Sequence, residues 1–309
     1  MQPYRRELRA HCYRMLGSLQ DAEDALQEAL LGAWRGLASF EGRSSLRTWL
    51  HRIATNACLR LIERRANHRI LSPDHGPPWQ DTGDLGEPVS GDTWLEPWPD
   101  DGPDPAQRML RRESVELAYV AALQHLPGTQ RAVLIMCEVL ELSAAEVAEM
   151  LETTTASVNS ALQRARKTVQ DRTAVTSQQQ ELAALGDSGQ RALVDAFVSA
   201  WERADLAALT SLLAEDARFT MPPLPAWFQG RDSVRRFFAE RVFATPWRLV
   251  PLRANGQLGF ACYLREPGAD RFRLGAINVL SLRDSKITWL AGFLDPSIHR
   301  YFRQPLELG

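Results

Sequence analysis

The sequence predicts a multidomain chain, with two all-α segments followed by a C-terminal α+β domain. Apolar residues recur at helical spacing over residues 3–66 and again over 109–172. Proline, glycine and acidic residues dominate the stretch between them, 67–108. From residue 190 onwards, helical patterns give way to a run of strand patterns. This order is typical of helices packed on a curved, mostly antiparallel sheet.

The composition narrows the class of protein. A chain of 309 residues with 45% hydrophobic residues can form two or three domains with proper cores. The net charge of −2 argues against an indiscriminate nucleic-acid binder, but the charge is unevenly spread. Residues 1–66 carry more arginines than acids, whereas 67–108 carry nine acids against Arg69 and Arg108. The segments therefore have different expected partners.

The cysteines and the N-terminus carry no special signal. Cys12, Cys58, Cys137 and Cys262 show neither zinc nor redox spacing. The chain starts without a signal-peptide pattern, and no run approaches the roughly 18 apolar residues of a membrane span. We expect a soluble, cytoplasmic protein without metal, cofactor or membrane span.

The first helical segment combines an acidic helix with a basic one. DAEDALQEAL has apolar residues at helical spacing and follows a capping turn at Ser18. The next helix begins near Leu46, can be capped by Ser44 or Ser45, and carries Trp49 and an arginine run. An acidic helix suits a basic protein partner, and a basic helix with an aromatic residue suits unstacked DNA.

Residues 67–108 predict an extended or disordered linker, because so polar a segment buries too little apolar surface to offset its chain entropy. Tryptophan is rare in linkers. Trp79, Trp94, Leu95 and Trp98 therefore indicate that part of it docks elsewhere.

The second helical segment predicts a helix-turn-helix. In SAAEVAEMLETTTASVNSALQRAR, Ser143 and Glu146 form a capping box, and Thr153 or Thr154 caps the second helix. The expected buried faces are Ala145, Val147, Ala148 and Leu151, then Val158, Ala161 and Leu162. Residues 173–189 read as a linker or helical extension.

The C-terminal domain, 190–309, predicts three helices near 190–203, 205–213 and 232–244. Its expected strands lie near 216–221, 247–254, 258–265, 271–283 and 286–294.

Several stretches carry a family resemblance. DAEDALQEAL, FEGRSSLRTWLHRIATNACLRLIERR and LPGTQRAVLIMCEVLELSAAEVAEMLETTTASVNSALQRAR resemble regions 2 and 4 of sigma-70-family factors of the extracytoplasmic-function group. WERADLAALTSLLAEDARFTMPPLP and WFQGRDSVRRFF resemble a SnoaL-like domain, a cone-shaped α+β fold. The resemblance implies region 2 at 1–66, an acidic linker at 67–108, region 4 at 109–172, a linker at 173–189 and a SnoaL-like domain at 190–309.

The resemblance implies a promoter-specificity subunit of RNA polymerase that makes and breaks no bond itself. Its expected partners are core RNA polymerase, through the β′ clamp and the β flap, and promoter DNA. The acidic linker would thread toward the active-site channel. The free protein is expected to be a monomer, and a separately encoded anti-sigma factor is left open as a further partner.

The residues implied to bind the polymerase are Asp21, Glu23, Asp24, Gln27 and Glu28. The plain alternative is a solvated acidic helix.

Recognition of the minus-10 element requires a pocket for flipped bases, a stacking or apolar wall, and cations for the backbone. The residues implied are Arg43, Thr48, Trp49, Arg52, Asn56, Arg60 and Arg64. The Asn56 amide can both donate to and accept from a base. Trp49 can equally be a core residue, and the arginine run a solvated helix end.

The residues implied for the minus-35 element are Thr154, Thr155, Ser157, Asn159, Ser160, Arg164 and Arg166. Many relatives carry Lys and Arg where this chain has Asn159 and Ala161, so charge-driven affinity should be lower. Glu152 stands where relatives often have Gly, which predicts a strained turn.

The SnoaL-like domain leaves two readings open. Polar and aromatic residues that would line a small-molecule pocket are Trp201, Met221, Trp227, Tyr263, Trp289 and Asp295. We prefer a packed core with a docking face, because His299 is the domain's single histidine and no acid–base pair can be assigned. The domain is expected to regulate in cis at high effective concentration, with either sign. The alternatives are a ligand-responsive helix-turn-helix regulator, or an enzyme domain fused to a DNA-binding module.

Overall fold

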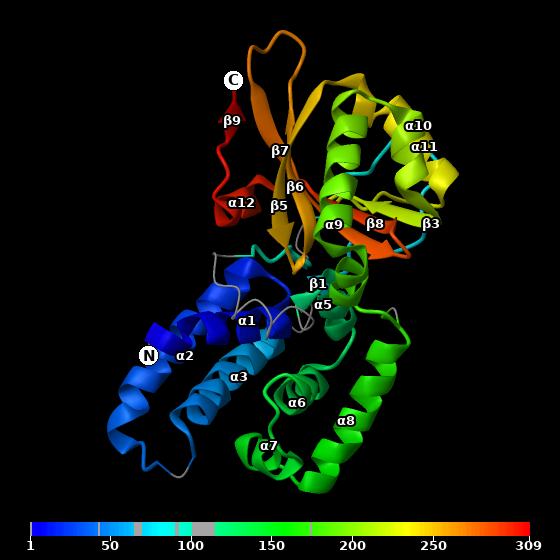
Figure 1. Cartoon of the computed structure of the whole chain (residues 1–309). Helices are drawn as coiled ribbons and strands as arrows, with labels where there is room; N and C mark the ends of the chain where they lie inside the picture. The colour runs from blue at the N-terminus through cyan, green and yellow to red at the C-terminus, as the bar shows by residue number, and fades with distance from the viewer. Residues whose placement is uncertain (1, 43, 65–69, 90–92, 101–114, 174) are drawn as a thin grey trace. The chain divides into compact units, whose positions relative to one another are not determined.

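The computed structural model describes the whole chain except residues 1, 43, 65–69, 90–92, 101–114 and 174 (Figure 1). The chain is divided into two compact units. The first comprises Met1–Ser72 and Leu117–Val175, and the second Pro73–Glu116 and Thr176–Gly309. The two helical segments therefore form one body, and the linker between them belongs with the C-terminal domain.

The first helical segment folds as a short 3₁₀ turn and three helices. Their bounds are η1 (Gln2–Tyr4), α1 (Arg5–Leu16), α2 (Leu19–Gly36) and α3 (Leu46–Arg64), with η2 (Leu37–Ser39) after α2 and β1 (Ile70–Leu71) after α3. Gly17 ends α1 in a left-handed conformation, with φ 68°. The Ser18 hydroxyl then accepts from the Asp21 amide at 3.3 Å, and the Ser45 hydroxyl accepts from the Thr48 amide at 3.0 Å. Both predicted capping turns are confirmed.

The second helical segment comprises α5 (Leu117–Gln124), α6 (Gly128–Glu138), α7 (Ala144–Met150) and α8 (Thr155–Gln170). The Ser143–Glu146 capping box starts α7, and the Thr154 hydroxyl caps α8. The predicted helix-turn-helix is confirmed. Its buried face needs one correction: Ala145 is exposed and Met150 is buried, because Ala145 lies on the other side of α7 from Val147 and Met150.

Helix α6 joins the two helical segments. It contacts both α1 and α3. The guanidinium of Arg131 is buried and bonds the Met15 carbonyl at the end of α1, and also the Leu126 carbonyl at 3.0 Å. A Cβ built on Gly128 would lie 3.3 Å from Leu59 of α3, so the first turn of α6 sits directly against that helix.

The second unit holds a seven-stranded mixed sheet in the order β4-β3-β8-β7-β6-β5, with β9 paired to β7 (Figure 1). The strands are β3 (Leu213–Thr220), β4 (Trp227–Gln229), β5 (Trp247–Ala254), β6 (Gln257–Leu264), β7 (Phe272–Arg283), β8 (Lys286–Phe293) and β9 (Glu307–Leu308), and β2 (Thr93–Trp94) precedes them in the chain. Pairing of β3 with β8 is parallel and the other pairings in this sheet are antiparallel. The predicted α+β class with a mostly antiparallel sheet is confirmed.

Three helices cover one face of this sheet (Figure 1). They are α9 (Gln178–Glu202), α10 (Leu206–Leu212) and α11 (Arg231–Glu240), with η4 (Val242–Ala244) after α11. Helix α12 (Pro296–His299) contacts β7 and is followed by η5 (Arg300–Phe302). Aromatic rings fill the space between helices and sheet. Phe197 of α9 stacks on Phe260 of β6 with centroids 4.7 Å apart, and Phe237 of α11 stacks on Phe228 of β4 at 4.5 Å.

Helix α9 begins earlier than the predicted helix near 190–203. Ser177 and Gln180 form a second capping box at its start. The Gln178 amide donates to the Leu282 carbonyl at 2.8 Å and accepts from the Leu282 amide at 2.6 Å, which ties the helix start to β7. The helix kinks at Gly186, whose φ is 64°.

The described part of the linker lies along the C-terminal domain. The Trp79 amide donates to the Trp227 carbonyl at 2.7 Å, and the Trp98 amide donates to Asn255 Oδ1 at 2.8 Å. Trp94, Leu95 and Trp98 are buried. The predicted docking of these apolar residues is confirmed. Within the described ranges, no helix is both long and apolar enough to cross a membrane.

Candidate protein- and DNA-binding surfaces

The acidic helix α2 uses most of its carboxylates inside the fold. Asp21 is buried. Glu23 forms ion pairs with Arg5 at 2.5 Å and Arg9 at 3.3 Å. Of the five predicted polymerase-binding residues, Asp24 and Gln27 are the fully exposed ones. These two side chains are therefore available to a partner protein.

Two large apolar residues that were not predicted as binding residues extend this exposed face. Leu31 and Trp34 are 56% and 72% exposed. They lie four and seven positions after Gln27, on the same side of α2 as Asp24. We call Asp24, Gln27, Leu31 and Trp34 the α2 stripe. Exposed apolar residues grouped beside polar ones mark interaction surfaces. The available signal was Trp34 itself, which falls outside the buried alanine and leucine pattern of α2.

The start of α3 carries the predicted minus-10 residues. Trp49 is half-buried, and its ring packs against Phe40 with centroids 5.0 Å apart. The Thr48 hydroxyl lies 2.8 Å from that of Ser45, and Asn56 is half-buried. One part of the Trp49 side chain is therefore packed and another part stays accessible, which is compatible with both of the roles left open. Arg43 lies outside the described residues.

Each predicted minus-10 cation that the structure describes is paired with a glutamate from another element. Arg52 lies 3.0 Å from Glu152 in the helix-turn-helix. Arg60 and Arg64 lie 2.7 and 3.5 Å from the two carboxylate oxygens of Glu28 on α2. In the free chain a carboxylate therefore lies beside each of these guanidiniums.

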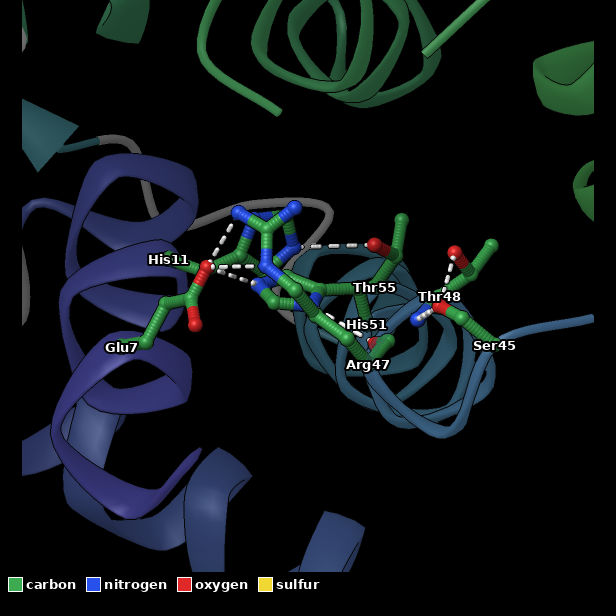
Figure 2. A network of polar contacts seen from close by, with 7 residues as sticks. All are labelled: Glu7, His11, Ser45, Arg47, Thr48, His51 and Thr55. Atoms are coloured by element: carbon green, nitrogen blue, oxygen red, sulfur yellow. Dashed lines mark hydrogen bonds and ion pairs between the residues drawn. The ribbon is translucent and has the colours of Figure 1, made fainter. Parts of the chain in front are cut away.

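A buried polar network fixes α3 against α1 (Figure 2). His11 Nε2 of α1 lies 2.9 Å from the Thr55 hydroxyl, and the His51 Nδ1–H donates to the Arg47 carbonyl at 2.9 Å. The Arg47 guanidinium bonds the Glu7 carboxylate, which also lies 3.7 Å from His51 Nε2. The network ties α1 to the first turns of α3, where Thr48 and Trp49 lie.

Burial governs the protonation of both histidines. It lowers the pKa of His11 well below the ordinary 6.5, and the charges of His51 and Arg14 lower it further. Burial also lowers the pKa of His51, against the raising effects of the Arg47 carbonyl and Glu7. Near neutral pH both rings are uncharged. The position of α3 therefore depends on neutral imidazoles.

The recognition helix α8 presents a polar outer face. Thr155, Asn159, Ser160 and Arg164 are exposed. Thr154, Ser157 and Arg166 are exposed as well. The Thr154 hydroxyl also caps the helix at the Ser157 amide, and Arg166 pairs with Glu138 at 2.6 Å. Gln163, one turn after Asn159, shares its side of the helix and was not predicted. Glu152 adopts φ 54°, as its replacement of glycine in the turn predicts.

The residues predicted for a C-terminal pocket each have contacts within the second unit, and the prediction that they line a pocket stays a prediction. Trp201 and Met221 belong to the packed aromatic core. Tyr263 donates to the Pro305 carbonyl at 2.9 Å, and Trp289 donates to the Thr220 hydroxyl at 3.0 Å. Trp227 donates to the Gly76 carbonyl of the linker, and Asp295 is exposed and caps α12.

A shallow groove of about 390 Å³ lies elsewhere in this unit, between α9 and β5. Its lining includes Gln190, Arg191, Val194 and Leu252. Within the described ranges, no group of His, Cys, Asp and Glu residues is arranged to hold a metal ion.

Comparison with known families gives matches to three separate parts of the chain. The family described as Sigma-70 region 2 matches residues 1–68. Sigma-70, region 4, matches 116–169, and the SnoaL-like domain matches 194–290.

Two relatives from Mycobacterium tuberculosis match over nearly the whole length. The ECF RNA polymerase sigma factor SigG is 43% identical, over 99% of this chain and 83% of the relative. The ECF RNA polymerase sigma factor SigJ is 29% identical, over 98% of this chain and 92% of the relative. The crystal structure of SigJ superimposes with a TM-score of 0.65 over 98% of both chains, at 24% identity, which shows a shared fold.

Proposed function

Because this chain belongs to the extracytoplasmic-function RNA polymerase sigma factors, we propose that it binds core RNA polymerase through the α2 stripe and reads promoter DNA with α3 and α8. The observation that carries the proposal is the division of the first helical segment into two surfaces. Helix α2 exposes an acid, an amide, a leucine and a tryptophan, whereas α3 carries the aromatic residue and the cations.

The α2 stripe suits the β′ clamp. Tryptophan and neighbouring polar groups are typical of the few residues that dominate protein interfaces. Asp24 adds a charge that complements a basic helix. Trp34 would contribute most of the binding energy, and Asp24 would fix the position of α2 along the clamp.

The DNA-binding part of the proposal assigns α3 to the minus-10 element and α8 to the minus-35 element. Trp49 and Asn56 would hold an unstacked base, with Arg52, Arg60 and Arg64 on the backbone. Asn159, Gln163 and Arg164 would face the major groove, since amides and guanidiniums read base edges there. The second helical segment would also contact the β flap.

The C-terminal domain would regulate in cis through the linker. Described linker residues from Asp74 to Asp100 bond its side chains and backbone, including Arg218, Trp227 and Asn255. The minus-10 and minus-35 elements are separate sites on DNA, so the two helical segments would move apart to read both. That movement would pull on the linker and hence on the bonds that hold it.

Run-off transcription with core RNA polymerase on the chain's own upstream region tests the function. The full chain should give transcripts from a defined start. Chain 1–175, which ends before α9, should give a different amount, and the ratio reports the sign of control. Trp34→Ala should weaken core binding roughly ten-fold or more, whereas Leu306→Ala, an exposed apolar residue in the other unit, should not. Tight duplex binding without polymerase and no transcript would instead favour a stand-alone regulator.

A further inference from the structure

Glu28 stands between the two surfaces of the first helical segment. It lies on α2 one turn after Asp24, so both carboxylates share a side of that helix. Its Oε1 accepts from Arg60 Nη2 at 2.7 Å and from Nε at 3.2 Å, and its Oε2 lies 3.5 Å from Arg64. One carboxylate therefore engages two guanidiniums of α3.

The geometry leaves Glu28 reachable from outside. Its side chain is 41% exposed, and the side chains of Arg60 and Arg64 are 53% and 64% exposed. Ion pairs this exposed are weak and exchange partners readily. A cation brought to Asp24 by a docking protein would also come within reach of Glu28.

We propose that Glu28 exchanges partners when the polymerase docks: the clamp's cations take Glu28, and Arg60 and Arg64 are released to the DNA backbone. This inference rests on the proposed function and describes how docking of the polymerase regulates DNA binding within it. In the free chain the carboxylate occupies the positions that two phosphates would take, so backbone binding is weak. After docking, both guanidiniums can contact phosphates. Core binding and DNA binding then favour each other by the same factor, as linkage requires.

The test measures binding of the full chain, without polymerase, to a fluorescein-labelled single-stranded oligo(dT) 20-mer over a salt series. Such a probe reports phosphate contacts and no sequence recognition. Glu28→Gln keeps the side-chain shape and removes the charge. It should tighten binding about five-fold and steepen the salt dependence by up to about 1.4 in log–log slope, which is the value for two added single-strand contacts.

Glu63→Gln is the matched control. Glu63 lies on α3 between Arg60 and Arg64 in sequence, is exposed, and makes no ion pair within the described ranges. Glu63→Gln changes the net charge by the same amount as Glu28→Gln. A smaller effect of Glu63→Gln therefore shows that the ion pairs of Glu28, and not the net charge, control binding. In an Arg60→Gln, Arg64→Gln background, Glu28→Gln should have no effect. Equal effects of the two glutamate variants, or an undiminished effect in that background, would overturn the inference.

A second arm separates this inference from the function on which it rests. With core polymerase added at a concentration that saturates both proteins, the wild type and Glu28→Gln should bind the probe with similar affinity, because docking has already released the arginines. A persisting five-fold difference would contradict the exchange. A failure of the proposed function shows separately, as the absence of any wild-type run-off transcript.

Discussion

Helices α3 and α8 carry the predicted DNA contacts, yet different chemistry holds each in place. Polar groups add to the buried apolar face of α3: beside Leu50 and Ala54, the rings of His11 and His51 are buried between α3 and α1 and bond to Thr55 and to the Arg47 carbonyl. An apolar seam fixes α8, where Val158, Ala161 and Ala165 are buried. A helix held by polar groups responds to protonation, whereas one held by apolar burial responds to loss of volume.

Arg131 makes a polar contact between the two helical segments. It is the buried charged side chain among the described residues 117–175, and it bonds the Met15, Gln124 and Leu126 carbonyls. Burial lowers its pKa to about 10, so it stays charged at neutral pH. Hydrogen bonds of a buried charged side chain therefore also hold α6 against the end of α1.

Arg131→Met should therefore produce the largest loss of stability. Several buried carbonyls lose their donor, at a cost of about 3 kcal/mol in the free energy of unfolding. Urea unfolding followed by far-UV circular dichroism measures it. Arg172→Met, at an exposed arginine after α8, is the control and should change stability by less than about 0.5 kcal/mol. A similar small change for both variants would show that Arg131 is dispensable.

Acidification should affect α3 next. Because folding lowers the pKa of His11 and His51, the unfolded chain binds protons that the folded chain does not. Their neutral state therefore stabilises the fold above the ordinary value of 6.5, and this stability is lost as pH falls below it. The loss approaches about 1.4 kcal/mol per pH unit for each histidine.

Urea unfolding at pH 7.5 and 5.5 measures that loss. His11→Gln keeps an amide near Thr55 and removes one of three rings whose pKa folding lowers, His11, His51 and His299, so it should lose less stability on acidification than the wild type, by about one third. His75→Asn, at an exposed histidine, should lose as much as the wild type. If His11→Gln matches the wild type as well, the buried pair does not set the pH dependence.

The local features of both helices could be predicted, because their causes lie within a few residues. Ser143 with Glu146 and Thr154 with Ser157 are neighbours, so their caps follow from spacing alone. The partners of the cations could not be predicted, since Arg52 and Glu152 are 100 positions apart. The position of Trp34 outside the buried alanine and leucine pattern was a local signal of its exposure, but that signal alone does not decide the environment of the side chain. An apolar residue on α2 is ordinarily buried, and its environment depends on where α1 and α3 pack.

The same limit applies to the second unit. Patterns predicted β5, β6, β7 and β8 within a residue or two, because long strands rich in apolar residues and bounded by turn residues stand out in the sequence. The short β4, β9 and α12 were missed, and the parallel pairing of β3 with β8 depends on a contact across about seventy residues that no local pattern encodes. Docking of the linker was expected from its tryptophans, but the surface that receives them was not.

Glu152→Gly tests the smallest effect, in the turn that precedes α8. A glutamate at φ 54° is strained, and glycine adopts this conformation freely, so the substitution should stabilise the chain by up to about 1 kcal/mol. Loss of the exposed pair with Arg52 offsets only part of this gain. Glu149→Gly, inside α7, should instead cost about 1 kcal/mol, because glycine disfavours a helix interior. Opposite signs in thermal unfolding would show that backbone conformation sets the stability of this turn. Destabilisation by both would mean that the Arg52 contact contributes more than the strain removes, so that α8 too would depend on a polar contact with α3.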